Sequence, residues 1–135
     1  MERHPGLRVL FTHLAGDFFG LLGRFSITHE RLLPADDPIV MQTRTNEIEA
    51  PDILARLHDG QVYVDTAWAP AEMIELAVKV LGPDRVLLGT DGSPHPLSSS
   101  FALEQMDALR AEPGTVEKIK WENASSFFRW EVDTH

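Results

Sequence analysis

The sequence contains no cysteine, which excludes a disulfide framework, a thiol nucleophile and thiolate metal ligands. Any metal ion must therefore be held by nitrogen and oxygen donors. Basic residues are also few, because 12 Lys and Arg stand against 21 Asp and Glu and give a formal net charge of −9. A chain this acidic repels phosphate groups, which argues against binding to nucleic acid or to an anionic membrane.

Long apolar runs and targeting signals are missing too. No stretch approaches the roughly 20 apolar residues that cross a bilayer. Residues 1–6 lack the apolar run of a signal peptide, so we expect a cytoplasmic protein. With 135 residues, of which 43% are hydrophobic, the chain can bury a core and is expected to form one domain over residues 1–135.

Three short apolar runs, each bounded by turn residues, predict β-strands over residues 8–13, 61–66 and 85–91. The first and third are apolar almost throughout, which is typical of strands covered on both faces in a parallel sheet. Between the second and third, residues 71–81 carry apolar side chains at helical spacing, after a proline and before a glycine. Strand, helix and strand of these lengths indicate a βαβ unit and therefore an α/β fold.

The remaining segments predict helices and one long connection. The predicted elements are a helix over 17–33, a polar connection over 34–51, short helices over 52–57 and from Thr115, a helix over 101–110 capped by Ser100, and a terminal helix over 123–130.

Polar residues end two of the predicted strands: His13 ends the first and Asp91 ends the third. Ligands bind at the carboxyl ends of strands in parallel α/β folds, and imidazole and carboxylate groups suit zinc, manganese or iron. Each residue also has a structural interpretation, because an aspartate after a strand often forms a turn and a histidine there is often structural. Asp65 could point into the site or cap the turn that follows it, and we favour the cap. We interpret Trp68 and Phe18 as packing residues rather than as platforms for a substrate. Taken alone, these residues predict an α/β domain and leave its function open.

Four segments are distinctive when taken together: HPGLRVLFTH at residues 4–13, VYVDT at 62–66, LGPDRVLLGTD at 81–91 and ENASSFF at 122–128. Their order and spacing resemble the amidohydrolase-2 family, which includes decarboxylases related to aminocarboxymuconate-semialdehyde decarboxylase. The resemblance covers nearly the whole chain. It implies the C-terminal part of a (β/α)₈ TIM barrel, with strands six to eight of the barrel in this chain.

The resemblance also implies roles for single residues. His13 matches the family histidine at the end of strand six, which acts on the metal-bound water or the substrate. Asp91 matches the acid at the end of strand eight, which binds the metal, and His95 in the following loop is a candidate substrate contact. The sequence departs from the family pattern at two places. Leu14 and Ala15 stand where the decarboxylases have glycines, which concerns the decarboxylase branch. The loop after Asp91 is one residue longer than the usual aromatic-Pro-His pattern, which concerns His95, whose other interpretation is a solvated loop histidine.

By resemblance, the function is that of a metal-dependent hydrolase or decarboxylase acting on a small carboxylic acid, lactone or amide. The expected cofactor is a divalent metal ion, zinc first, with manganese and iron as alternatives. Family members also bind this ion through a His-x-His pair on strand one and a histidine on strand five, and no His-x-His occurs in this sequence.

A whole barrel takes roughly 200–250 residues or more. We therefore expect this chain either to belong to a longer protein or to be a shortened relative that pairs with another chain, as a homo-oligomer or with the missing half of the barrel. The alternative function is that of a non-catalytic barrel remnant serving as a binding or assembly module. A small doubly wound domain of unrelated function is a third interpretation.

Overall fold

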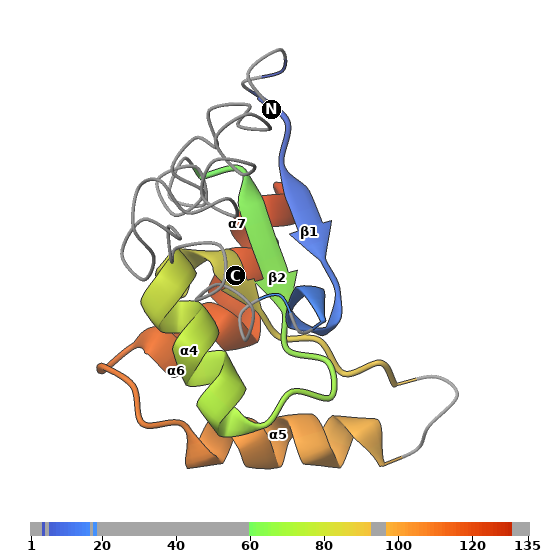
Figure 1. Cartoon of the computed structure of the whole chain (residues 1–135), viewed down its shortest axis with the longest axis vertical. Helices are drawn as coiled ribbons and strands as arrows, with labels where there is room; N and C mark the ends of the chain where they lie inside the picture. Colours follow the sequence, from blue (N-terminus) through green and yellow to red (C-terminus); the bar gives the residue numbers. More distant parts are fainter. Residues whose placement is uncertain (1–3, 5, 17, 19–59, 93–96, 131–135) are drawn as a thin grey trace, which may run out of the picture.

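The computed structural model describes residues 4, 6–16, 18, 60–92 and 97–130 (Figure 1). Several predicted features lie outside the described residues: the helix over 17–33 apart from Phe18, the connection over 34–51, the helix over 52–57 and the candidate contact His95.

Three parallel strands form the sheet, in the order β1 (Val9–Phe11), β2 (Val62–Asp65) and β3 (Val86–Leu87). Figure 1 shows β1 and β2 side by side and pointing the same way. Because all three strands run in one direction, their carboxyl ends lie at one edge of the sheet. The predicted parallel α/β arrangement is confirmed.

The strands are shorter than the ranges 8–13, 61–66 and 85–91, and for two of them the structure shows why the strand ends. Beyond β1, the backbone enters the left-handed region at His13, with φ of 54°. Beyond β3, the N–H of Leu88 donates to the carbonyl of Ile119 at 2.8 Å, and so no longer takes part in the ladder. His13 and Asp91 therefore lie in the turns that follow the strands.

Coverage on both faces was predicted for the first and third strands, and it holds only for the third. Val86 and Leu87 of β3 are buried, at 0% and 2% exposure. In β1, by contrast, Val9 and Leu10 are half-buried and Phe11 is 44% exposed. The prediction was wrong for β1 because this strand packs chiefly against its neighbour β2 among the described elements, whereas helices and a helical turn pack on β3. The elements that pack on β3 are α4 (Ala71–Leu81), the turn η4 (Lys118–Glu122) and α7 (Asn123–Phe128).

The predicted helix over 71–81 is confirmed as α4 (Ala71–Leu81). Its buried face includes Ile74 and Ala77, which form one hydrophobic core with Val64 of β2. The helix ends at Gly82, where φ is 87°, a conformation that glycine adopts without steric cost.

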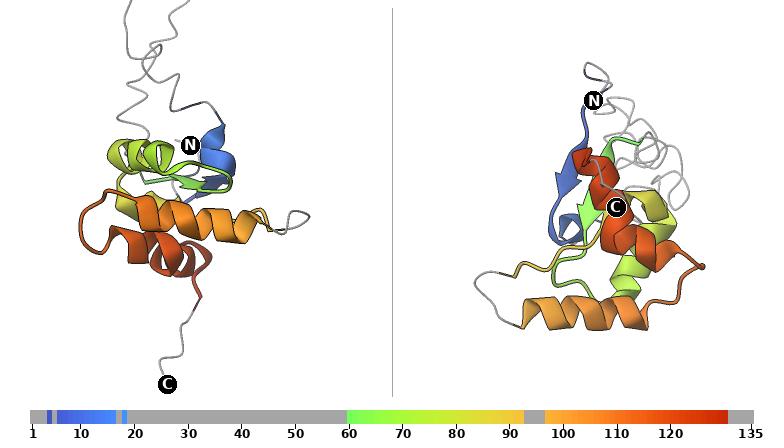
Figure 2. Two further views of the ribbon diagram at one scale, coloured as in Figure 1. Left: turned by 90° about the horizontal axis from the view of Figure 1, so that it is seen from below. Right: turned by 180° about the vertical axis from the view of Figure 1, so that it is seen from behind.

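The opposite face of the sheet is covered by α7 (Asn123–Phe128). Side chains alternate along a strand, so Tyr63 points away from the face of Val62 and Val64. The Tyr63 ring meets Phe127 of α7 edge-to-face at a centroid distance of 4.8 Å. The guanidinium carbon of Arg8 lies 5.1 Å from the centroid of the Phe127 ring. Figure 1 shows α4 beside the lower part of β2, and the view from behind in Figure 2 shows the red α7 in front of the strands.

The other helices are α5 (Ser98–Ala108), α6 (Thr115–Glu117) and the π-helical turn η4 (Lys118–Glu122), which runs directly into α7. The predicted start of a short helix at Gly114-Thr115 is confirmed, with Gly114 as the residue before the first helical one. The helix predicted over 101–110 begins earlier, at Ser98, and ends at Ala108. Ser100, the predicted cap, therefore lies inside the helix, where its hydroxyl donates to the carbonyl of Leu97 at 3.0 Å. Among the described residues, no helix is long and apolar enough to cross a membrane.

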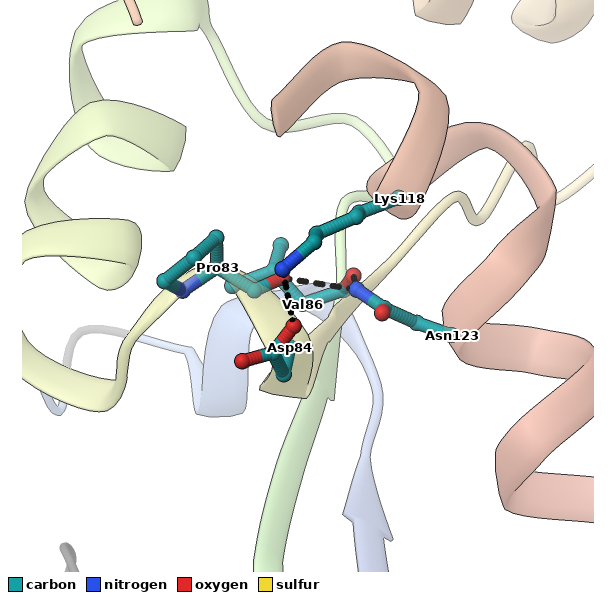
Figure 3. Close-up of polar contacts among 5 residues, drawn as sticks. All are labelled: Pro83, Asp84, Val86, Lys118 and Asn123. Atoms are coloured by element: carbon teal, nitrogen blue, oxygen red, sulfur yellow. Dashed lines mark hydrogen bonds and ion pairs between the residues drawn. The ribbon is translucent and has the colours of Figure 1, made fainter. Parts of the chain in front are cut away.

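The amino end of β3 is held to the C-terminal helices by the contacts drawn in Figure 3. Asn123, which is 5% exposed, donates through Nδ2 to the carbonyls of Pro83 at 2.7 Å and Val86 at 2.8 Å. Lys118 donates to Asp84 Oδ1 at 2.6 Å, and this hydrogen bond together with the negative charge of Asp84 raises the pKa of Lys118. Asn123 of the segment ENASSFF thus fixes the amino end of β3. The carboxyl end of β3 is followed by a turn and carries no hydrogen bond to this asparagine.

Candidate active site

The carboxyl edge of the sheet carries both residues that the sequence indicates. His13 follows β1 and Asp91 follows β3, and these two strands flank β2 in the same direction. Both residues are exposed. The segment between them, residues 65–68 at the end of β2, contacts each of them.

His13 begins a tight turn of left-handed backbone, η1 (His13–Ala15). The φ angles of His13, Leu14 and Ala15 are 54°, 50° and 58°. Left-handed backbone costs an L residue roughly 1–2 kcal/mol. The departure from glycine at Leu14 and Ala15 therefore places L residues in a conformation that glycine adopts without strain. Leu14 is 3% exposed and belongs to the hydrophobic core, so burial of its side chain opposes the strain.

Backbone strain is concentrated at this edge. Besides the η1 turn, Trp68 has a φ of 55° and Asp91 a φ of 49°. Of the described non-glycine residues with positive φ, all except Arg129 lie in the three turns that follow the strands. Strained residues of this kind cluster at ligand and active sites, where surrounding contacts hold them in place.

The Asp65 carboxylate connects the three strand ends. Its Oδ1 accepts a hydrogen bond from the backbone N–H of His13 at 2.8 Å and another from the N–H of Ala67 at 3.1 Å. A Cβ added to Gly89 would lie 2.8 Å from Asp65 Cγ, so the carboxylate packs directly against the backbone that follows β3. The predicted turn-capping role of Asp65 is confirmed by the Ala67 bond. The bond to His13 was not predicted.

Thr66 fixes the spacing between the turns after β2 and β3. Its side chain is buried, and its Oγ1 accepts the backbone N–H of Gly89 at 3.1 Å and lies 3.4 Å from the carbonyl of the same residue. The Thr66 side chain thus continues the hydrogen bonding between the β2 and β3 segments after the backbone ladder ends. This contact sets where the chain turns toward Asp91.

Asp91 is held by Trp68. The indole Nε1–H of Trp68 donates to Asp91 Oδ2 at 3.1 Å, and the indole ring stacks on Phe101 of α5 at a centroid distance of 5.6 Å. Trp68 is 39% exposed. The predicted packing role is confirmed by the Phe101 contact, whereas the hydrogen bond to Asp91 was missed, because nothing in the local sequence pairs these two residues.

The donor chemistry of the edge fits a metal ion only in part. Among residues 4–18 and 60–130, as far as they are described, no group of three or more His, Asp or Glu side chains could hold one ion. Asp91 by itself fits the role of one oxygen donor, because the indole engages Oδ2 and the carboxylate has a second oxygen to offer. The described residues therefore supply one suitable donor and not a coordination set.

A groove of about 660 Å³ lies elsewhere, between the end of α4 and the segment 109–115. Its lining includes Glu75, Val78, Pro83 and Arg110. Pro83 precedes β3, so the groove lies at the amino ends of the strands, whereas His13 and Asp91 lie at the carboxyl ends. We therefore base the candidate site on the carboxyl edge and not on this groove.

Comparison with known proteins gives a consistent result. A sequence model of the family described as "Amidohydrolase" matches residues 1–130. Among solved structures, the chain is similar to the IDCase of Metarhizium anisopliae in apo form, with a TM-score of 0.71 and 21% identity over 91% of this chain and 34% of that one.

Two decarboxylases with bound manganese are similar as well. The dihydroxybenzoic acid decarboxylase of Polaromonas sp. JS666 gives a TM-score of 0.68 and 19% identity, over 95% of this chain and 35% of that one. The D314N mutant of the 5-carboxyvanillate decarboxylase of Novosphingobium aromaticivorans DSM 12444 gives a TM-score of 0.71 and 19% identity, again over 95% of this chain and 35% of that one. The chain thus spans about a third of the length of these structures. At such identities the likeness shows the fold, part of a TIM barrel with three parallel strands and flanking helices.

Proposed function

The chain belongs to the amidohydrolase family, and from that premise we propose that it forms the part of a metal-dependent hydrolase or decarboxylase that carries an acid–base histidine and one metal-binding carboxylate. The supporting observation is the placement of His13 and Asp91 at the same carboxyl edge, with Asp65 and Trp68 between them. Active sites of (β/α)₈ enzymes lie at this edge.

His13 is the proposed proton carrier. The backbone N–H of His13 donates to Asp65 Oδ1 at 2.8 Å, which holds the turn in place. His13 is exposed, so its imidazole can reach a ligand beyond the carboxyl ends of the strands. An imidazole carries two ring nitrogens, one of which can accept a proton while the other donates one. In a decarboxylation it would deliver a proton to the carbon that loses CO₂, and in a hydrolysis it would protonate the leaving group or stabilise the developing oxyanion.

Asp91 is the proposed metal ligand. A bound divalent ion would supply Lewis acidity toward a substrate carboxylate or carbonyl. The two decarboxylases described above contain bound manganese, which supports testing Mn²⁺ first, and zinc stays the expectation from sequence resemblance. The other donors of a complete site would have to come from outside the described residues.

The proposed substrate is a small molecule with a carboxylic acid group. Both manganese-bound neighbours described above are decarboxylases, one of dihydroxybenzoic acid and one of 5-carboxyvanillate, which favours a carboxylic acid over the lactone and amide alternatives. His95 stays a proposed substrate contact. A cytoplasmic location and self-association also stay predictions.

The test is decarboxylation by the purified chain loaded with Mn²⁺, using 2,6-dihydroxybenzoate and 5-carboxyvanillate and measuring released CO₂. If the wild type is active, His13→Gln and Asp91→Asn should each lower kcat by about 10²-fold or more. Asp84→Asn is the matched control, because this carboxylate is 70% exposed and lies at the amino end of β3. Equal activity in His13→Gln and the wild type would contradict the proposed role of His13.

The alternative, a non-catalytic module for binding or assembly, is favoured by one observation: the described residues lack a set of three metal donors. This alternative predicts no metal-dependent activity and a defined complex with itself or another chain. Metal analysis after loading and size-exclusion chromatography with light scattering separate the two functions. A metal-free, monodisperse monomer without activity would contradict both.

A further inference from the structure

We infer that Asp65 is a further ligand-binding residue of the candidate site, whose second carboxylate oxygen, Oδ2, accepts a hydrogen bond from a hydroxyl or ammonium group of the ligand. The inference rests on the proposed function for the place of the ligand at the carboxyl edge, and it requires no metal ion. Its basis is the difference between the two oxygens of this carboxylate. The protein engages Oδ1, whereas Oδ2 has no partner among the described residues.

The carboxylate of Asp65 is fixed at its first oxygen. Oδ1 accepts the backbone N–H of His13 at 2.8 Å and that of Ala67 at 3.1 Å, so it joins the turns after β1 and β2. The carboxylate also packs on Gly89, where an added Cβ would lie 2.8 Å from Asp65 Cγ and 2.9 Å from Oδ1. The direction of Oδ2 is therefore set before a ligand arrives, and a preorganised group loses little freedom on binding.

The second oxygen is accessible to a ligand. Every buried side-chain nitrogen or oxygen of the described residues has a hydrogen-bond partner. Since Oδ2 has none in this part of the chain, it is not buried, although Asp65 as a whole is half-buried. Side chains alternate along β2, so Asp65 lies on the face of Tyr63 and opposite Val64, which belongs to the core shared with α4.

The negative charge of Asp65 is more than a turn cap requires. An asparagine offers the same acceptor oxygen to a turn, so capping does not account for the charge. No Lys or Arg of the described segments forms an ion pair with Asp65. The turns that follow the strands, residues 12–16, 65–69 and 88–92, contain two aspartates and no Lys or Arg. A hydroxyl or ammonium group suits such an edge, because hydrogen bonds to a charged acceptor are stronger than those between neutral groups.

The experiment titrates the metal-free full chain, labelled with ¹⁵N, with small probes. Resorcinol carries hydroxyl donors, benzylammonium carries an ammonium donor, and 1,3-dimethoxybenzene has the resorcinol ring without a donor. The signals to follow are the backbone amides of His13 and Ala67, because both donate to the Asp65 carboxylate. We expect resorcinol or benzylammonium to shift both signals and 1,3-dimethoxybenzene to leave them in place, and the tighter of the two donors identifies the group that Asp65 accepts.

The variant Asp65→Asn isolates the second oxygen. Its amide oxygen can still accept the two N–H groups, which the slow exchange of the His13 amide would verify, while an NH₂ donor replaces Oδ2. Probe binding should weaken by about 10-fold or more, because the charged acceptor is lost. Asp84→Asn removes the same charge at the amino end of β3 and should leave probe binding unchanged. The inference is overturned if Asp65→Asn binds the probes as tightly as the wild type does. Should this variant lose the turn, the wild type alone decides: no shift with either donor, or equal shifts with 1,3-dimethoxybenzene, also overturns the inference.

This experiment is separate from the test of the proposed function, because it needs neither a metal ion nor turnover. If Asp65→Asn weakens probe binding and the Mn²⁺-loaded wild type releases no CO₂, the ligand-binding role of Asp65 stands and the proposed function fails. If the wild type releases CO₂ and Asp65→Asn binds the probes equally well, the proposed function stands and the role of Asp65 fails.

Discussion

Replacing Asn123 by alanine should destabilise the chain by loosening the contact between its C-terminal helix and the sheet. The amide of Asn123 is buried at 5% exposure and donates to the carbonyls of Pro83 and Val86 (Figure 3). These two bonds connect the helix α7 to the start of β3. The substitution removes both donors at once.

The size of the effect follows from the two bonds, at 2.7 Å and 2.8 Å. A hydrogen bond between uncharged groups contributes about 1 kcal/mol net, and a buried polar group left without its partner costs roughly 1–3 kcal/mol. We therefore expect Asn123→Ala to lower the free energy of unfolding by about 2–4 kcal/mol. For a domain of this size that corresponds to a fall in Tm of roughly 10 °C.

The assay is urea unfolding followed by circular dichroism, with the slope m compared between variants. Asn123→Asp is a second test of the same two bonds. Its carboxylate has nearly the shape of the amide, but it would face two carbonyl oxygens without an N–H to donate. This contact would raise the pKa of the new carboxyl above its unfolded value. Its penalty should therefore be small near pH 4 and should grow as the pH rises to neutral.

The control is Ser125→Ala on the same helix, whose hydroxyl donates to the carbonyl of Trp121 at 3.1 Å on the exposed side. It should change the free energy of unfolding by less than about 0.5 kcal/mol. If Asn123→Ala costs no more than Ser125→Ala, or if Asn123→Asp is equally stable at both pH values, the two buried bonds do not hold the helix to the sheet.

Two further predictions concern other parts of the molecule. Asp65→Ala removes the acceptor of the His13 and Ala67 N–H groups and should cost about 2 kcal/mol, with faster hydrogen exchange at the His13 amide; unchanged exchange there would contradict the bond. The Lys118–Asp84 pair raises the pKa of Lys118, so its stabilisation is complete below the ordinary lysine pKa and is lost as the pH rises through the raised value. The stability difference between the wild type and Lys118→Met should therefore be constant from pH 7 to about 10, shrink above that, and shrink with added salt; a difference that grows with alkaline pH would contradict it.

Features set by a short stretch of chain were predicted from the sequence. The helix over 71–81 was placed correctly, because its apolar spacing, the proline before it and the glycine after it all act within a few residues. The three strands and their parallel direction were also confirmed. Their ends were not, because a strand ends where its hydrogen bonds go elsewhere, as the N–H of Leu88 does toward Ile119.

Contacts between distant residues could not be predicted in this way. The bond from His13 to Asp65 joins residues 52 positions apart, and the bond from Trp68 to Asp91 joins residues 23 positions apart. Whether such groups meet depends on strand register and on the φ angles of the turns. Left-handed backbone at Leu14 and Ala15 could not be inferred from side chains that do not favour it.

The sequence by itself determined which residue types end the first and third strands, because local patterns of apolar and turn residues fix where strands lie. It also carried the family resemblance, since that depends on the order of motifs along the chain. Only the tertiary structure decided that the β2 turn stands between His13 and Asp91 and binds to both. The reason is physical: strand pairing fixes which turns are neighbours, and the strained turns then fix which atoms come within hydrogen-bonding distance.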